Sequence, residues 1–182
     1  GLTARYIAGL LGGEGATHAW VEIYHDGRWV GLDPTHNRMV DDSSYTYGEI
    51  DDKAARLAAW LVEQGVAPGD VVTFQMPTWA EFCIVYVAAL KAGAVMHPLP
   101  RNFNDADLVY GMNLVGSRAF ICPTKVAKVD FESQILSIVD QIPTLGPVAL
   151  VDKAAPKHSE LPTVAEICAR YRANSNTPPH HV

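Results

Sequence analysis

Hydrophobic and polar positions divide this chain into two parts with different periods. In residues 1–40, short runs of β-branched and aromatic side chains are separated by polar turns, a pattern typical of antiparallel strands. We expect these strands at residues 4–11, 17–24 and 28–32. The His-Asp-Gly step at residues 25–27 indicates a hairpin, because glycine supplies the positive φ that such turns need.

From Tyr45 the pattern changes to helical periods that alternate with short apolar strands. The expected helices cover residues 46–64, 78–92, 105–114, 131–141 and 163–171, and the expected strands cover 71–75, 94–98, 118–122 and 148–151. Thr46 with Glu49, and Thr78 with Glu81, form capping-box patterns at two helix starts. Strict alternation predicts parallel strands with helices packed on the sheet. The predicted fold class is therefore α/β, a short antiparallel β segment followed by a parallel-sheet α/β partial domain.

The change of period predicts the organisation of the chain. We expect a β segment over residues 1–43, an α/β unit over 44–171 and a flexible tail over 172–182. The helix at 78–92 is almost wholly apolar, and we interpret its aromatic residues, together with Met76, as core.

Composition excludes several classes of function. Of 182 residues, 48% are hydrophobic and 19% charged, and the net charge of −6 disfavours a nucleic-acid surface. No apolar run reaches the roughly 18 residues that span a bilayer. Three cysteines, Cys83, Cys122 and Cys168, form neither a metal pair nor an even disulfide framework, so we expect reduced thiols in a cytoplasmic protein. We expect no metal site.

The first part carries a family resemblance. The runs GLTARYIAGLL, THAWVEIY and GRWVGLDPTHNRMVDD, which together cover residues 1–43, resemble the C-terminal half of a transglutaminase-like (papain-like) core. In that family a cysteine thiolate attacks an amide. The resemblance implies that His18 is the base that activates the thiol and that Asp33 orients the imidazole. Trp20 would pack beside them.

The nucleophile of this pair is not apparent in the sequence. The family's cysteine precedes these strands in a Cys-Arg-Asp type motif, and we expect that this chain begins after that point. Cys83, Cys122 and Cys168 have other surroundings: mid-helix, strand end and last helix. An interpretation in which His18 and Asp33 have only structural roles therefore stays open.

The second part resembles another family. Residues 45–162 carry SYTYGEIDDKAARLAAWLVEQGVAPGD, then VVTFQMPTWAEFCIVYVAALKAGAVMHPL, then RNFNDADLVYGMNLVGSRAFICPT. They resemble the N-terminal part of an adenylate-forming (AMP-binding) acyl-CoA synthetase, closest to fatty-acyl or related carboxylate–CoA ligases. Such enzymes join a carboxylate to AMP from ATP and then transfer the acyl group to CoA. The resemblance thus implies ATP, Mg and CoA as the cofactors of the family.

The family's chemistry requires groups that this sequence does not carry. Its phosphate loop reads like Thr-Ser-Gly-Thr-x-Gly-x-Pro-Lys-Gly, and we expect the chain to end near the place where that loop would begin. We therefore expect no cofactor to be bound by this chain and interpret residues 45–162 as scaffold. Lys91 and Gly93 are interpreted as a helix-dipole partner and a C-cap rather than as phosphate contacts.

Four functions remain open from the sequence. The first is a non-catalytic fusion of two enzyme fragments, the larger resembling an ATP-dependent carboxylate–CoA ligase. The second is part of an active acyl-CoA synthetase completed by another chain, and the third is a transglutaminase-like thiol amidase using His18 and Asp33. The fourth is a self-associating interaction module, because an incomplete sheet exposes an edge. The expected partners are accordingly a complementary ligase fragment or a second copy, with no nucleic acid.

Overall fold

The computed structural model describes residues 3–10, 17–25, 28–33, 38–39, 45–151 and 160–171 of the 182-residue chain. The first part of the chain forms an antiparallel sheet. Its strands are β1 (Ala4–Leu10), β2 (Thr17–His25), β3 (Arg28–Asp33), β4 (Arg38–Met39) and β5 (Tyr45–Thr46), in the order β4-β3-β2-β1-β5. The β2–β3 pairing places His25 opposite Arg28, as the predicted hairpin requires. The antiparallel prediction is confirmed.

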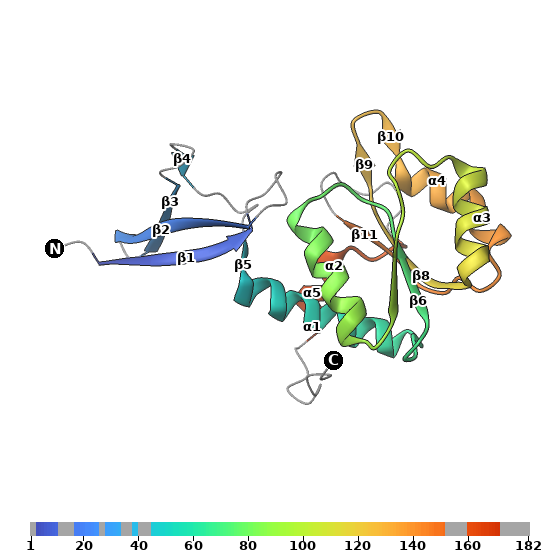
Figure 1. Cartoon of the computed structure of the whole chain (residues 1–182), viewed down its shortest axis with the longest axis horizontal. Helices are drawn as coiled ribbons and strands as arrows, with labels where there is room; N and C mark the ends of the chain where they lie inside the picture. Colours follow the sequence, from blue (N-terminus) through green and yellow to red (C-terminus); the bar gives the residue numbers. More distant parts are fainter. Residues whose placement is uncertain are drawn as a thin grey trace.

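A close backbone approach joins this sheet to the helix that follows. Gly9 of β1 pairs with Thr46 of β5, and Thr46 is also the N-cap of the first helix. A Cβ at Gly9 would collide with the carbonyl oxygen of Tyr45 and lie 2.8 Å from the ring of Trp20. Glycine at this position therefore lets β5 lie against β1. In Figure 1 the blue strands connect through β5 to the start of α1.

The rest of the described chain forms a parallel sheet with helices on both faces (Figure 1). Its sheet has the order β11-β8-β6-β7, from β6 (Val71–Phe74), β7 (Val95–Pro98), β8 (Ser117–Pro123) and β11 (Val148–Val151). The helices are α1 (Tyr47–Glu63), α2 (Ala80–Lys91), α3 (Asp105–Val115), α4 (Phe131–Ile138) and α5 (Val164–Arg170). All three strand pairings are parallel, which confirms the α/β prediction.

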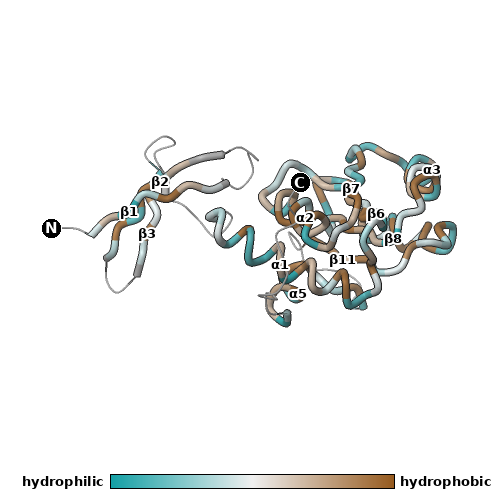
Figure 2. The backbone as a smooth tube through the Cα atoms, turned by 60° about the horizontal axis from the view of Figure 1, so that its bottom comes forward, coloured by the Kyte–Doolittle hydropathy of each residue, from teal (hydrophilic) through white to brown (hydrophobic). Residues whose placement is uncertain are grey.

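Alternate residues of each strand contribute to two separate cores. Val72, Phe74 and Ile121 face a cluster that includes residues of α1, α2 and α5. Phe120 and Leu150 belong to a second cluster with residues of α3 and α4. Both faces of the sheet are thus covered, which explains why its strands read as continuous apolar runs. Figure 2 shows this concentration of hydrophobic positions around the sheet.

Local capping explains most helix ends. Thr46 and Glu49 form the predicted capping box, and Asn104 caps α3 as expected. Gly65 and Gly93, with φ of 86° and 72°, follow the ends of α1 and α2 in the left-handed conformation that favours glycine.

The predicted capping box at Thr78 is wrong. The N-cap of α2 is Trp79, whose side chain makes no capping hydrogen bond. The helix begins one residue later than the box requires, so Glu81 occupies the second helical position and is turned inward, 8% exposed. We attribute the start of α2 at Ala80 to the packing of this apolar helix against the sheet, which outweighs the Thr78–Glu81 capping pattern.

Other differences from the sequence prediction are short elements. A hairpin of β9 (Lys125–Val126) and β10 (Val129–Asp130) follows β8, and its turn holds Ala127 at a φ of 52°. Sequence analysis did not detect it, because no glycine or asparagine marks the turn. The predicted helix at 131–141 is α4 followed by a 3₁₀ turn over Val139–Gln141. None of the helices in the described ranges is long and apolar enough to cross a membrane.

Candidate functional site

The predicted pair His18 and Asp33 lies on neighbouring strands of the antiparallel sheet. His18 is in β2, where its backbone pairs with Gly9 of β1, and its side chain lies outside the described residues. Asp33 ends β3 and is 1% exposed. Trp20, predicted beside the site, is 2% exposed. The sheet thus brings the two strands together, and the roles of His18 and Asp33 stay predictions.

The glutamate of the HAWVE run is occupied by structural contacts. The carboxylate of Glu22 accepts a hydrogen bond from Arg5 Nε at 2.7 Å and one from Trp20 Nε1 at 3.4 Å. The Arg5 guanidinium also lies 4.1 Å from the centre of the Trp29 ring, a cation–π geometry. Sequence reasoning did not select Arg5, although its register opposite Glu22 is the signal that would have found it.

None of the three thiols has the surroundings of an activated nucleophile. Cys122 is fully buried in β8, and burial together with the charge of Glu132 raises the pKa of its thiol. Burial also raises the pKa of Cys83 and of Cys168. Since the thiolate is the reactive form, these shifts oppose nucleophilic chemistry. The predicted positions of the three cysteines, mid-helix, strand and last helix, are confirmed.

Buried polar groups gather where the parallel strands end. This edge is where α/β sheets place ligands, and β6 lies between its successors β7 and β8. Gln75 follows β6, and its Nε2 donates to the carbonyl oxygen of Pro100 at 2.8 Å. Its Oε1 is buried and has no hydrogen-bond partner within the described ranges. Thr124 follows β8, and its carbonyl oxygen accepts from the backbone N–H of Glu132 at the start of α4.

A second set of polar side chains is hydrogen-bonded across three neighbouring strands of the sheet. Thr73 of β6 lies with its hydroxyl 3.1 Å from Nδ1 of His97 in β7, and it also bonds the hydroxyl of Ser117 in β8. Thr73 and Ser117 are fully buried, whereas His97 is half-buried on the edge strand. Burial lowers the pKa of His97. The Thr73 hydroxyl thus connects Ser117 and His97 in one hydrogen-bonded network across the sheet.

The largest hollow that we describe lies between α3 and α4. It has a volume of about 910 Å³, and apolar side chains of Val109, Tyr110, Leu114 and Ile138 line much of it. A smaller hollow of about 300 Å³ lies between α1 and α5, beside Arg56 and Cys168. Neither of these two hollows is lined by His18 or Asp33.

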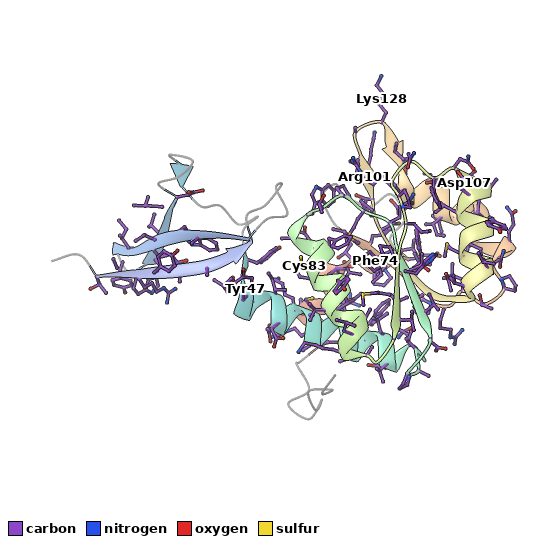
Figure 3. All side chains as sticks on the ribbon, in the orientation of Figure 1. Tyr47, Phe74, Cys83, Arg101, Asp107 and Lys128 are labelled. Atoms are coloured by element: carbon purple, nitrogen blue, oxygen red, sulfur yellow. The ribbon has the colours of Figure 1, made fainter. Side chains whose placement is uncertain are left out.

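The remaining sequence candidates have ordinary structural positions. Lys91 lies in the last turn of α2, as interpreted, and its Nζ is 2.9 Å from a carboxylate oxygen of Asp51. Two cations that the sequence analysis did not select, Arg101 and Lys128, lie on the side of the sheet where the strands end (Figure 3). Within the residues that can be described, no group of three or more histidine, cysteine and acidic side chains is arranged to hold a metal ion.

Comparison with protein families identifies the larger part of the chain. A family model described as AMP-binding enzyme matches residues 28–181. The chain therefore belongs to the AMP-binding enzyme family. A model of the transglutaminase-like superfamily matches residues 1–34, a short match that overlaps the first.

Curated relatives include CoA ligases and AMP ligases. The chain is 39% identical over 130 residues to a medium-chain fatty-acid–CoA ligase of Escherichia coli, which covers 70% of this chain and 23% of that protein. It is 28% identical over 134 residues to a salicyl-AMP ligase / salicyl-S-ArCP synthetase of Mycobacterium tuberculosis, covering 74% and 23%. The chain thus spans about a quarter of the length of these relatives.

Solved structures share the fold. An anthranilate CoA ligase, AuaEII, in complex with anthranoyl-AMP matches 73% of this chain and 23% of its own, with a TM-score of 0.63 and 16% identity. A benzoate CoA ligase from Burkholderia xenovorans matches 75% and 25%, with a TM-score of 0.58 and 22% identity. The α/β arrangement of the described residues is therefore that of adenylate-forming ligases.

The described residues do not by themselves assemble a complete site for the family's nucleotide and metal. At the strand ends the side chains of Gln75 and Thr124 are buried, and so is that of the acidic Glu132. Magnesium binds to oxygen ligands, and the described residues contain no group of three or more histidine, cysteine and acidic side chains that could hold a metal ion. We accordingly derive no step through ATP, Mg or CoA.

Proposed function

We propose that this chain is a non-catalytic fusion of two enzyme segments, and that its larger segment is scaffold of an ATP-dependent carboxylate–CoA ligase. The ligase part of the proposal is supported most by the AMP-binding match over residues 28–181, together with the parallel sheet. The proposed boundaries are 1–43 for the transglutaminase-like segment and 44–171 for the ligase segment. A cytoplasmic location remains part of this proposal.

The polar contacts of the ligase segment support a scaffold role. Thr73, Ser117 and His97 bond one another across three strands, and Gln75 holds the loop after β7 through Pro100. These side chains use their hydrogen bonds to fix the sheet and its loops. A layer that is fixed in this way holds a neighbouring active site in place without supplying its reacting groups.

A segment exchange tests the scaffold role. The matched 130-residue segment of the Escherichia coli medium-chain ligase is replaced by the corresponding segment of this chain, and acyl-CoA formation from octanoate is measured. We expect the exchanged enzyme to keep measurable activity, because the scaffold topology is shared. The proposal fails if the exchanged enzyme folds but forms no acyl-CoA.

Assays of the isolated chain test the non-catalytic part. We expect no ATP–pyrophosphate exchange above a no-enzyme control, with octanoate or with benzoate. Exchange by the isolated chain would overturn this part. Exchange that appears only after a second polypeptide is added would favour the alternative of a ligase completed by another chain.

The transglutaminase-like match makes a thiol amidase the second candidate. It is supported by the adjacency of β2 and β3, which carry His18 and Asp33. The test is hydrolysis of amide substrates by the wild-type chain and by the His18→Ala variant. Thiol-dependent cleavage that is lost in the variant would favour the amidase, whereas equal background in both proteins would remove it.

A further inference from the structure

The hollow between α3 and α4, which we call the α3–α4 groove, follows the whole length of one helix. Its lining runs along one face of α3, from Asp105 in the first turn to Leu114 in the last. Ser137, Ile138 and Gln141 form the opposite side. Figure 1 shows the two helices side by side at the same end of the parallel sheet. Because α3 has 11 residues, the groove is about 16 Å long.

Two large apolar side chains beside the groove take no part in the core. Tyr110 and Leu114 are four residues apart on α3, so they lie on the same face, and they are 70% and 69% exposed. Neither belongs to one of the two core clusters, whereas Val109 and Ile138, which also line the groove, belong to the second. A solvated helix face normally carries polar residues, and an exposed apolar patch is typical of a binding surface.

Hydrogen bonds near both ends hold the two sides of the groove together. At the start of α3, Gln134 Nε2 donates to Asp105 Oδ1 at 2.9 Å and to the carbonyl oxygen of Phe103 at 3.3 Å. At the other end, Asn113 Nδ2 donates to the carbonyl oxygen of Gln141 at 2.9 Å. The groove is thus formed before any partner arrives, which reduces the conformational entropy that binding would cost.

The charge of the two sides determines what kind of partner fits. Asp105 lines the groove, and Asp140 is exposed in the turn between the lining residues Ile138 and Gln141. Residues 105–115 and 131–141, all of them described, include Asp107 and Glu132 as further acids and contain no lysine, arginine or histidine. Nucleic acids and anionic membranes are therefore repelled. A second copy is disfavoured as well, because a two-fold contact would bring the same carboxylates together.

From the shape, the apolar lining and the charge, we infer that the α3–α4 groove binds a basic amphipathic helix of another polypeptide. The apolar residues of that helix, at spacings of three and four, pack against Tyr110, Leu114 and Ile138. Its lysine or arginine side chains lie over Asp105 and Asp140. The length of the groove matches about three turns of a helix. The inference is independent of the proposed ligase scaffold, because it uses only α3, α4 and the turn that follows α4.

A synthetic peptide and matched variants test the groove. The probe is a fluorescently labelled peptide of about 14 residues, with leucine at helical spacings and lysine elsewhere, and a second peptide has glutamate in place of lysine. Binding to the 182-residue chain is followed by fluorescence anisotropy. The groove variant carries Tyr110→Ser and Leu114→Ser. The control carries Tyr86→Ser and Leu90→Ser, the same residue types at the same spacing on α2, where they are 38% and 45% exposed.

We expect the groove variant to weaken binding of the lysine peptide at least about tenfold and the control to change it less than about twofold, because a few apolar anchors dominate such contacts. Asp105→Asn combined with Asp140→Asn should weaken binding several-fold and reduce its dependence on salt, since the amide at residue 105 can still accept from Gln134. A photoreactive group in the probe should label residues 105–115 or 131–141.

Several results would overturn the inference. They are no saturable binding of the lysine peptide, equal weakening in the groove variant and the control, equal binding of the glutamate peptide, and photolabelling outside both helices. A dimer of the chain that the groove variant dissociates would assign the groove to a second copy and would also overturn it. If the groove variant does not fold, Leu114→Ser alone is compared with Leu90→Ser, and equal binding by these two single variants is again decisive against the groove.

Discussion

The guanidinium of Arg56 lies 3.1 Å from the backbone carbonyl oxygen of Cys168, although 112 residues separate the two in sequence. The same Nη1 atom donates to the carbonyl oxygen of Tyr171, also at 3.1 Å, while Nε is bonded to Asp52. Arg56 on α1 therefore satisfies two carbonyl groups at the end of α5. A cation at a helix C-terminus also interacts favourably with the helix dipole.

We predict that Arg56→Ala weakens the attachment of α5 to α1. Loss of charge-assisted hydrogen bonds is expected to destabilise the fold by about 1–3 kcal/mol, because two carbonyl groups lose their donor. Hydrogen exchange of the α5 amides measures the effect and is expected to accelerate in the variant. Arg170→Ala, on the exposed side of α5, is the control and is expected to change exchange little. Equal exchange in both variants would contradict the role of Arg56.

The hydroxyl pair of Thr73 and Ser117 leads to a second prediction. Thr73→Val keeps the shape of the side chain but leaves the buried Ser117 hydroxyl without this partner, at an expected cost of about 1–3 kcal/mol. The double variant Thr73→Val, Ser117→Ala removes both groups and is expected to recover part of that loss. Urea unfolding measures the free energies. A double variant that is less stable than Thr73→Val alone would argue against the network.

His97 is expected to make stability depend on pH. Burial lowers its pKa in the folded chain below the ordinary value of 6.5, so the unfolded chain binds the proton more readily. The contribution of the neutral His97 side chain to the free energy of unfolding is therefore fully present above pH 6.5. It is lost as the pH falls through the lowered pKa. Replacing His97 with Gln should flatten thermal stability across this window. Thermal stability is measured as a function of pH for the wild-type chain and for the variant, and the difference between the two curves is the effect of His97 without that of the other histidines. Parallel curves would contradict the prediction.

Gly9 is expected to control the contact between β1 and β5. Gly9→Ala places a Cβ against the carbonyl oxygen of Tyr45, and we expect a loss of about 1–3 kcal/mol from overpacking. Faster proteolysis near residue 45 would report the loosened pairing. Gly48→Ala is the control, because a Cβ there has no neighbour closer than 4.0 Å. The prediction is wrong if both variants are cleaved at the wild-type rate.

The local structure of this protein could be predicted from its residues. The alternation of helix and strand, the capping boxes at Thr46 and the N-cap at Asn104, and the glycines after α1 and α2 were all predictable, because each depends on residues within one or two turns. The family of the larger segment was also recognisable from its motifs, and the AMP-binding match confirms it. The roles of His18 and Asp33 stay predictions.

The relationships between residues far apart in the chain could not be predicted in this way, because they depend on how the elements pack. The strand order β11-β8-β6-β7, the bond from Arg56 to Cys168 and the start of α2 at Ala80 all depend on packing between elements. Tyr86 is a further case, since its apolar sequence environment predicts burial whereas its side chain is 38% exposed. Periodicity shows which residues are apolar, whereas contacts across the fold determine which of them are covered.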